Sequence, residues 1–351
     1  MDKMKTAYKV LAMAAFAVAF TACQKHVGSE STIGVRSGVV ETRADGDVDV
    51  ALQPMFLFWT DGNFNDATKA APDFFVRTPD GVIDDYKTER YNTGVYYPLY
   101  DKLVYSTGFA PAPGNGGIDF VTSGDYSSFT ISDTPNPSAY GDDVRGVVDP
   151  LAAATISGKD SDELGSLLFK HATTKIAFEA MLTPTMTKSV TNVRVEIPGS
   201  LNASTLTWDA AAGTYKVQGG ADDTDDYWMG AFWSNDGTYL ADDYRANETR
   251  VRLVSPIARE RVGYTLIAPP GNSMTVTVKY MQADNADAAF SERVIEGVVI
   301  NFKDASNNAI SLGAGDAYTV RFYFDNYDIE LVGQKRPWED GGFISVPIQI
   351  R

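Results

Sequence analysis

Apolar and polar residues alternate along much of this chain, and this period of two constrains the fold more than any other feature. The alternation runs through residues 190–198, 249–254, 273–281 and 317–324. Such stretches are typical of antiparallel strands that bury one face and leave the other in water. Neither half of the chain shows the alternating strands and helices of a parallel α/β sheet. We therefore predict an all-β protein with two β-sandwich domains.

The boundary between the two domains is expected in the polar stretch 157–166, because loops rich in proline and glycine precede it and regular alternation follows it. This divides the body of the chain into domains 44–163 and 164–351. A chain of 351 residues is long enough for two domains of ordinary size. The formal net charge of −16 is spread over small acidic clusters, and no basic surface for nucleic acid is visible.

The first residues have the composition of a secretory signal. Lysines near the start are followed by the apolar block Val10–Phe20, which is shorter than the roughly 20 residues that span a bilayer. The block ends in small residues directly before Cys23, the only cysteine of the chain. This arrangement resembles the bacterial lipobox, which implies a signal peptide over 1–22 and a lipid on Cys23 that anchors the chain in the outer membrane. The alternative is an ordinary signal peptide followed by an incidental cysteine.

Residues 24–49 are rich in glycine, serine and charge and have no sustained period. One interpretation is a flexible tether that lifts a folded body off a membrane. The other notes that Arg36 and Arg43 lie in a polar context that a trypsin-like protease can cut.

Three further stretches resemble those of a known family. They are residues 167–182 (LLFKHATTKIAFEAML), residues 91–111 (YNTGVYYPLYDKLVYSTGFAP) and residues 318–350, which contain Trp338 before an acidic turn. Together with Cys23 and an arginine about twenty residues later, they resemble the fimbrillins, which are pilin-like surface lipoproteins of Gram-negative gut and oral anaerobes.

The resemblance implies two transthyretin-like β-sandwich domains behind a lipoprotein signal. It also implies that an arginine-specific protease removes the lipidated leader 23–43, together with the first strand. A strand from another fimbrial subunit then fills the groove, because an open sheet edge binds an added strand through main-chain hydrogen bonds. On this basis Arg43 is the expected cleavage site and Arg36 the alternative. The chain would then be a fimbrial subunit at the cell surface with a role in adhesion.

The end of the chain offers a candidate donor strand. At a spacing of two, one face of an extended strand would carry Ile344, Val346, Ile348 and Ile350. Pro347 has no backbone N–H to donate to a neighbouring strand, which suits a strand at the edge of a sheet. The alternative is that this strand completes its own domain. Because the sequence ends at Arg351 without an extra arm, we expect a tip or accessory subunit that accepts a strand.

A second hypothesis is a glycan-binding surface lipoprotein. Trp228 and Trp233 lie among acidic residues in the stretch 222–244. Aromatic faces beside carboxylates suit stacking and hydrogen bonding of sugars, so host or bacterial glycans or proteins are candidate partners. The alternative is that at least one of the two indoles is buried in a sandwich core.

Catalysis is not expected. The two histidines are His26, beside the lipidation site, and His171, which shares a strand face with Phe169 and is interpreted as a packed structural residue. Paired aspartates lie in loops, and neither 45–49 nor 222–226 has a complete calcium-loop pattern. We predict no enzyme activity, no cofactor and no metal site.

Overall fold

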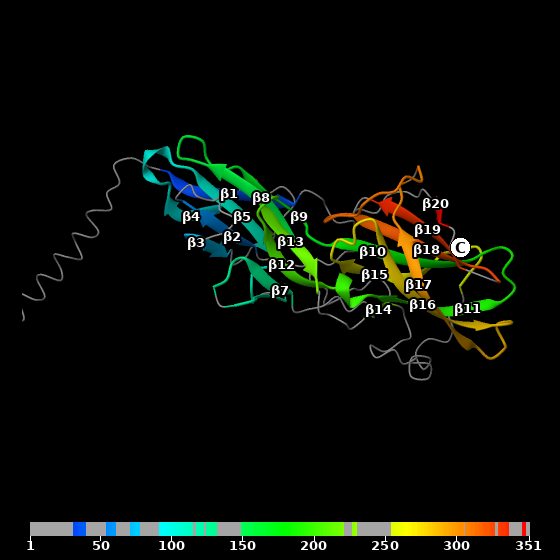
Figure 1. Cartoon of the computed structure of the whole chain (residues 1–351). Coiled ribbons are helices and arrows are strands. Elements are labelled where there is room, and N and C mark those ends of the chain that lie inside the picture. Colours follow the sequence, from blue (N-terminus) through cyan, green and yellow to red (C-terminus); the bar gives the residue numbers. More distant parts are fainter. Residues whose placement is uncertain are drawn as a thin grey trace, which may run out of the picture.

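A computed structural model gives the fold of the chain (Figure 1). It describes residues 31–39, 54–60, 71–77, 91–114, 117–122, 124–131, 149–220, 227–229, 254–304, 306–326, 329–336 and 346–348. The elements in these residues are strands, apart from the short 3-10 helices η1 (Leu99–Asp101) and η2 (Gly199–Leu201). The prediction of an all-β protein is confirmed.

The first sandwich consists of two sheets. The larger sheet has seven strands in the spatial order β3 (Phe74–Arg77), β2 (Met55–Trp59), β5 (Val104–Ala110), β8 (Leu151–Gly158), β9 (Ser166–His171), β1 (Thr32–Val39) and β4 (Tyr91–Tyr96). The smaller sheet has the order β13 (Thr214–Gly219), β12 (Ala203–Asp209), β7 (Ser128–Ile131) and β6 (Ile118–Phe120). Side chains such as Leu57, Phe109, Phe129 and Leu206 form the core between these sheets.

The second sandwich also consists of two sheets. One has the order β15 (Glu260–Ile267), β10 (Thr174–Leu182), β18 (Ala317–Phe324), β19 (Ile329–Arg336) and β20 (Val346–Ile348). The other has the order β14 (Tyr227–Met229), β11 (Ser189–Ile197), β16 (Ser273–Ala283) and β17 (Ser291–Asn301). Their facing side chains, among them Phe178, Val195, Val278 and Phe322, form one buried core.

The period of two in the sequence produces these strands as expected. Along β10 and most of β16, buried side chains alternate with more exposed ones, so one face packs and the other contacts water. Central strand β18 is buried at nearly all positions, because it lies between β10 and β19. One face carries Tyr318, Val320, Phe322 and Phe324 into the core, and on the other face the buried Arg321 is paired with Glu179 of β10. Of the predicted strand 249–254, only its last residue falls among those the structure describes.

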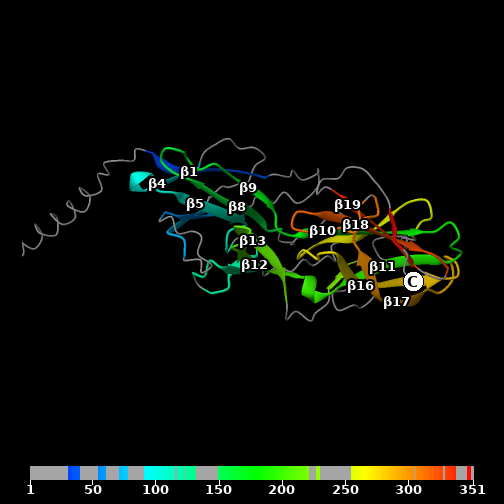
Figure 2. The same ribbon diagram turned by 45° about the horizontal axis from the view of Figure 1, so that its top comes forward.

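The chain passes between the two sandwiches more than once. Strand β9 lies in the seven-stranded sheet, and the hairpin β12–β13 returns to the first sandwich after β10 and β11 have entered the second. Figures 1 and 2 show this hairpin beside the strands drawn in blue and cyan. The hairpin returns because β12 pairs with β7 and its Leu206 packs in the first core. The sheets therefore do not follow the division expected between residues 163 and 164.

The seven-stranded sheet curls strongly about an apolar centre. Phe56 on β2 forms ring contacts with Phe169 on β9 and with Tyr91 on β4, which lie further along the same sheet. The enclosed cluster also contains Ile33 and Val35 of β1. This cluster is called the curl core below. It positions the site that follows.

Candidate functional site: the β1 position

Strand β1 lies between two neighbours and pairs with a different one along each half. Its first half pairs antiparallel with β4, with Thr32 opposite Tyr96 and Val35 opposite Tyr91. Its second half pairs in parallel with β9, from Arg36 opposite Ser166 to Val39 opposite Phe169. Within the described part of the chain, β4 is the last strand of the sheet and reaches it through β1. Removing β1 would therefore separate β4 from β9.

The side chains of β1 contribute directly to the curl core. Ile33 is 0% exposed and Val35 is 1% exposed. Both are β-branched residues, which favour extended backbone and pack well on a pleated surface. Arg36, which follows them, is exposed. The β1 position is thus filled by residues 32–39 of the same chain, and their side chains at 33 and 35 complete the curl core.

Polar contacts fix the start of β1. The hydroxyl of Ser31 donates a hydrogen bond to Oδ1 of Asp160, in the turn between β8 and β9. The backbone N–H of Tyr97 donates to the carbonyl oxygen of Ser31 at 3.4 Å. The Thr93 hydroxyl donates to the carbonyl oxygen of Ile33 at 2.8 Å. These contacts specify where the strand begins relative to its neighbours.

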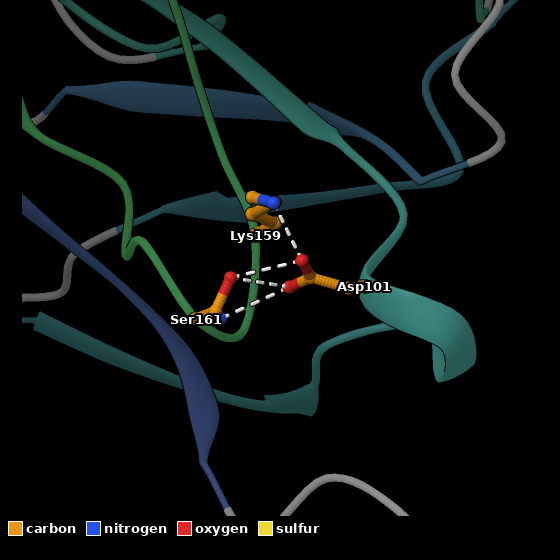
Figure 3. Close-up of polar contacts among 3 residues, drawn as sticks. All are labelled: Asp101, Lys159 and Ser161. Atoms are coloured by element: carbon orange, nitrogen blue, oxygen red, sulfur yellow. Dashed lines mark hydrogen bonds and ion pairs between the residues drawn. The ribbon is translucent and has the colours of Figure 1, made fainter.

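The turn that carries Asp160 is itself anchored to η1 (Figure 3). Nζ of Lys159 lies 2.5 Å from Oδ2 of Asp101, and the Ser161 hydroxyl donates to Oδ1 of Asp101 at 2.8 Å. These hydrogen bonds, those from Lys159 first, lower the pKa of Asp101 from 3.8 to about 2. Tyr100 and Asp101 both have positive φ, 64° and 53°, a conformation that non-glycine residues rarely adopt. The carboxylate contacts hold this turn in place.

The sequence matches no protein-family model and no curated protein. Among solved structures, a fimbrial protein from Bacteroides vulgatus ATCC 8482 superposes with a TM-score of 0.51 at 12% sequence identity. The match covers 87% of this chain and 99% of that protein. The chain has the fold of a fimbrial protein.

Two further solved structures are similar to this chain. A protein described as a putative cell adhesion protein from Parabacteroides distasonis ATCC 8503 superposes with a TM-score of 0.50 at 9% identity, over 86% of this chain and 90% of that protein. One described as a putative polysaccharide binding protein from Bacteroides thetaiotaomicron VPI-5482 has a TM-score of 0.42 at 10% identity, over 91% and 99% of the two chains. The two matches with TM-scores of 0.51 and 0.50 show that the expected resemblance in fold extends over most of the chain.

Several predicted site residues lie outside the part of the fimbrial fold that the structure describes. They are Cys23, His26, Arg43, Trp233, Ile344 and Ile350. The alternative cleavage residue, Arg36, lies within β1. The interpretation of 24–49 as an unfolded tether does not hold for residues 32–39, because buried side chains and two strand pairings order them.

The structure gives backbone positions for Trp228 and for part of the candidate donor strand. Trp228 lies in β14, opposite Glu196 of β11, and its predicted partner in stacking falls outside the described residues. Val346 and Ile348 lie in β20, which pairs antiparallel with β19. Residues 346–348, the described part of the candidate donor strand, therefore extend a sheet of the second sandwich of their own chain.

His171 lies in β9 and is buried. Its Nδ1 is 2.7 Å from Oδ2 of Asp149, and the Thr173 hydroxyl donates to the other oxygen of the same carboxylate at 3.2 Å. This arrangement fits the interpretation of His171 as a packed structural residue. Among the described residues there is no group of three or more metal-ligating acids, histidines or cysteines. No helix in that part of the chain is long and apolar enough to cross a membrane.

Proposed function

We propose that this chain is a subunit of a surface fimbria, or a lipoprotein associated with one, that assembles by exchange of strand β1. A protease cuts after an arginine that follows β1, the N-terminal segment leaves, and a strand from another subunit enters the β1 position. Each sandwich is transthyretin-like, and the unprocessed chain is held at the outer membrane by a lipid on Cys23. The protein acts by binding other subunits and has no catalytic role.

One observation carries the proposal: the first strand that the structure describes supplies core side chains to a sheet whose other described strands come from residues 55–171. Ile33 and Val35 pack against a core that the rest of the first sandwich provides. Their loss exposes apolar surface, and each fully buried side chain contributes roughly 1.5–3 kcal/mol. An incoming strand that restores this burial and the main-chain hydrogen bonds has a strong driving force.

The proposal is tested with the purified full-length chain and an arginine-specific protease. We expect loss of the N-terminal segment, seen by mass spectrometry, followed by capture of an added fluorescent peptide of residues 31–39, which supplies the strand for the β1 position. The variants Arg43→Lys and Arg36→Lys keep the positive charge but resist the protease, and they identify which bond must be cut. A chain that is cut after β1 but keeps its N-terminal segment, or that loses it and captures no added strand, would overturn the assembly mechanism.

A further inference from the structure

The contact between Ser31 and Asp160 connects residues 129 positions apart in the sequence. Both residues are partly exposed, so the hydroxyl and carboxylate meet at the rim of the curl core. A hydrogen bond to a charged acceptor is stronger than one between neutral groups. Its strict geometry also makes it sensitive to position along the strand.

The acceptor is held in a rigid turn. The N–H of Lys159 donates to the carbonyl of Asp162 at 2.8 Å, and the N–H of Asp162 donates back to the carbonyl of Lys159 at 3.0 Å. The side chains of Lys159 and Ser161 are bound to Asp101 in η1, as Figure 3 shows. Asp160 therefore has a fixed place when a strand enters beside it, and it does not need to be ordered by that strand.

The spacing of residues in β1 relates the Ser31–Asp160 contact to the recognition of an incoming strand. Ser31, Ile33 and Val35 are two apart, so they lie on the same side of an extended strand. We propose that Asp160 sets the register of the strand in the β1 position. It accepts a hydrogen bond from a hydroxyl located two residues before the first of two buried β-branched side chains. The inference rests on the proposed strand exchange.

Burial alone does not fix the register of every strand. A slip of one residue moves the apolar side chains to the wrong face, and such slips are excluded. A slip of two residues keeps the faces correct, and a strand with a long apolar run fits equally well in several such positions. The hydrogen bond to Asp160 distinguishes these positions, because only one of them brings the hydroxyl to the carboxylate.

The partner is therefore a strand of another chain with Ser or Thr at its start and β-branched residues two and four positions later, running in the direction of β1. The C-terminal stretch of this chain does not fit that description. Ile344, Val346, Ile348 and Ile350 fill one face at every second position, and Ser345 belongs to the opposite face. The β1 position thus favours a strand other than the C-terminal stretch of a second copy.

The inference is tested with peptides added to the full chain after cleavage, once the protease has been inhibited. Fluorescent peptides of residues 31–39 are compared with versions carrying Ser31→Ala, Ser31→Thr or Ser37→Ala, and with a peptide of residues 344–350. Binding is measured by fluorescence anisotropy. We expect Ser31→Ala to bind about fivefold to tenfold more weakly than the native peptide. Ser31→Thr and the control Ser37→Ala should bind like the native peptide, and peptide 344–350 should bind more weakly.

The same comparison on protein variants assigns the effect to the carboxylate. An Asp160→Ala chain should bind the native and Ser31→Ala peptides equally, whereas the control Asp162→Ala should still distinguish them. Equal binding of both peptides to the native chain would overturn the register inference and leave strand exchange intact. Failure of every peptide, the native one included, to bind the cleaved chain would instead overturn the proposed function.

The register inference can also be tested on the uncut chain, where no strand exchange is needed. Hydrogen exchange at the amides of residues 32–35 reports how firmly the start of β1 is held. Asp160→Ala should speed this exchange at least fivefold relative to Asp162→Ala. Equal rates in the two variants would show that Asp160 does not fix the strand.

Discussion

The aromatic rings of Phe56 and Tyr91 lie with centroids 6.4 Å apart, although four strands separate β2 from β4 in the order of the sheet. The sheet therefore closes on itself around the curl core, and β1 is one of the strands that complete the closure. Three predictions concern this region, and a fourth concerns the second sandwich.

The first prediction tests how much β1 contributes to stability. Replacing Ile33 by Ala removes a fully buried side chain and should lower the free energy of unfolding by about 2–4 kcal/mol. Arg36→Ala is the matched control on the same strand; its side chain is exposed, and the change should stay within about 0.5 kcal/mol. Urea denaturation of the uncut chain measures both. Equal stability of the two variants would mean that β1 is not part of the core.

The second prediction distinguishes the two arginines. A protease binds its substrate as an extended, unpaired segment, whereas the residues on both sides of the Arg36–Ser37 bond pair with β4 or β9. In the folded chain this bond should resist an arginine-specific protease, and in urea it should be cut. Mass spectrometry of the N-terminal fragments over time gives the two rates. Rapid cutting after Arg36 in the folded chain would contradict the pairing of β1.

The third prediction follows from the depressed pKa of Asp101. Because this pKa is about 2 in the fold and near 3.8 when the chain is unfolded, the contribution of Asp101 to stability is present above pH 3.8. It is lost as the pH falls through about 2. The difference in Tm between the native chain and Asp101→Asn should be constant from pH 7 to about pH 5 and shrink towards pH 2. A difference that grows on acidification would contradict the lowered pKa.

The fourth prediction concerns Glu179 and Arg321, which face each other on β10 and β18. Nη2 of Arg321 lies 2.6 Å from Oε2 of Glu179, and the arginine side chain is only 6% exposed. Glu179→Ala leaves a buried charge without its partner and should cost about 3 kcal/mol. Glu179→Ala combined with Arg321→Met should cost less than the sum of the single changes. Additive costs in this double-mutant cycle would show that the pair is not coupled.

The sequence was most informative where one face of a strand is buried and the other is wet. Met274, Val276 and Val278 repeat at a spacing of two over a long stretch, and β16 forms there with those residues in the core. Strand β1 shows the opposite situation. Its own alternating pattern is short. The strand is held in place by pairing with β4 and with β9, and β9 lies more than a hundred residues later in the sequence. A local pattern cannot report such partners.

Dependence on distant packing partners also explains why the return of β12 and β13 to the first sandwich was not expected from the sequence. Residues 203–219 alternate like neighbouring strands of the second sandwich, and the pattern does not say which sheet they join. Leu206 of β12 and Tyr215 of β13 have their packing partners in the first core, so the hairpin returns to it. At the candidate site, Arg36 was recognised from its residue type. Asp160 was not, because its role depends on a turn that only the folded chain brings to Ser31.

The return of β12 and β13 to the first sandwich has a consequence for how such proteins can diversify. A single crossover between two genes anywhere from residue 172 to residue 202 would leave one sandwich with a hairpin from a different parent. A single exchange therefore cannot join an intact first sandwich of one parent to an intact second sandwich of another. New combinations of halves require three exchanges, or a hairpin whose packing surface both parents share.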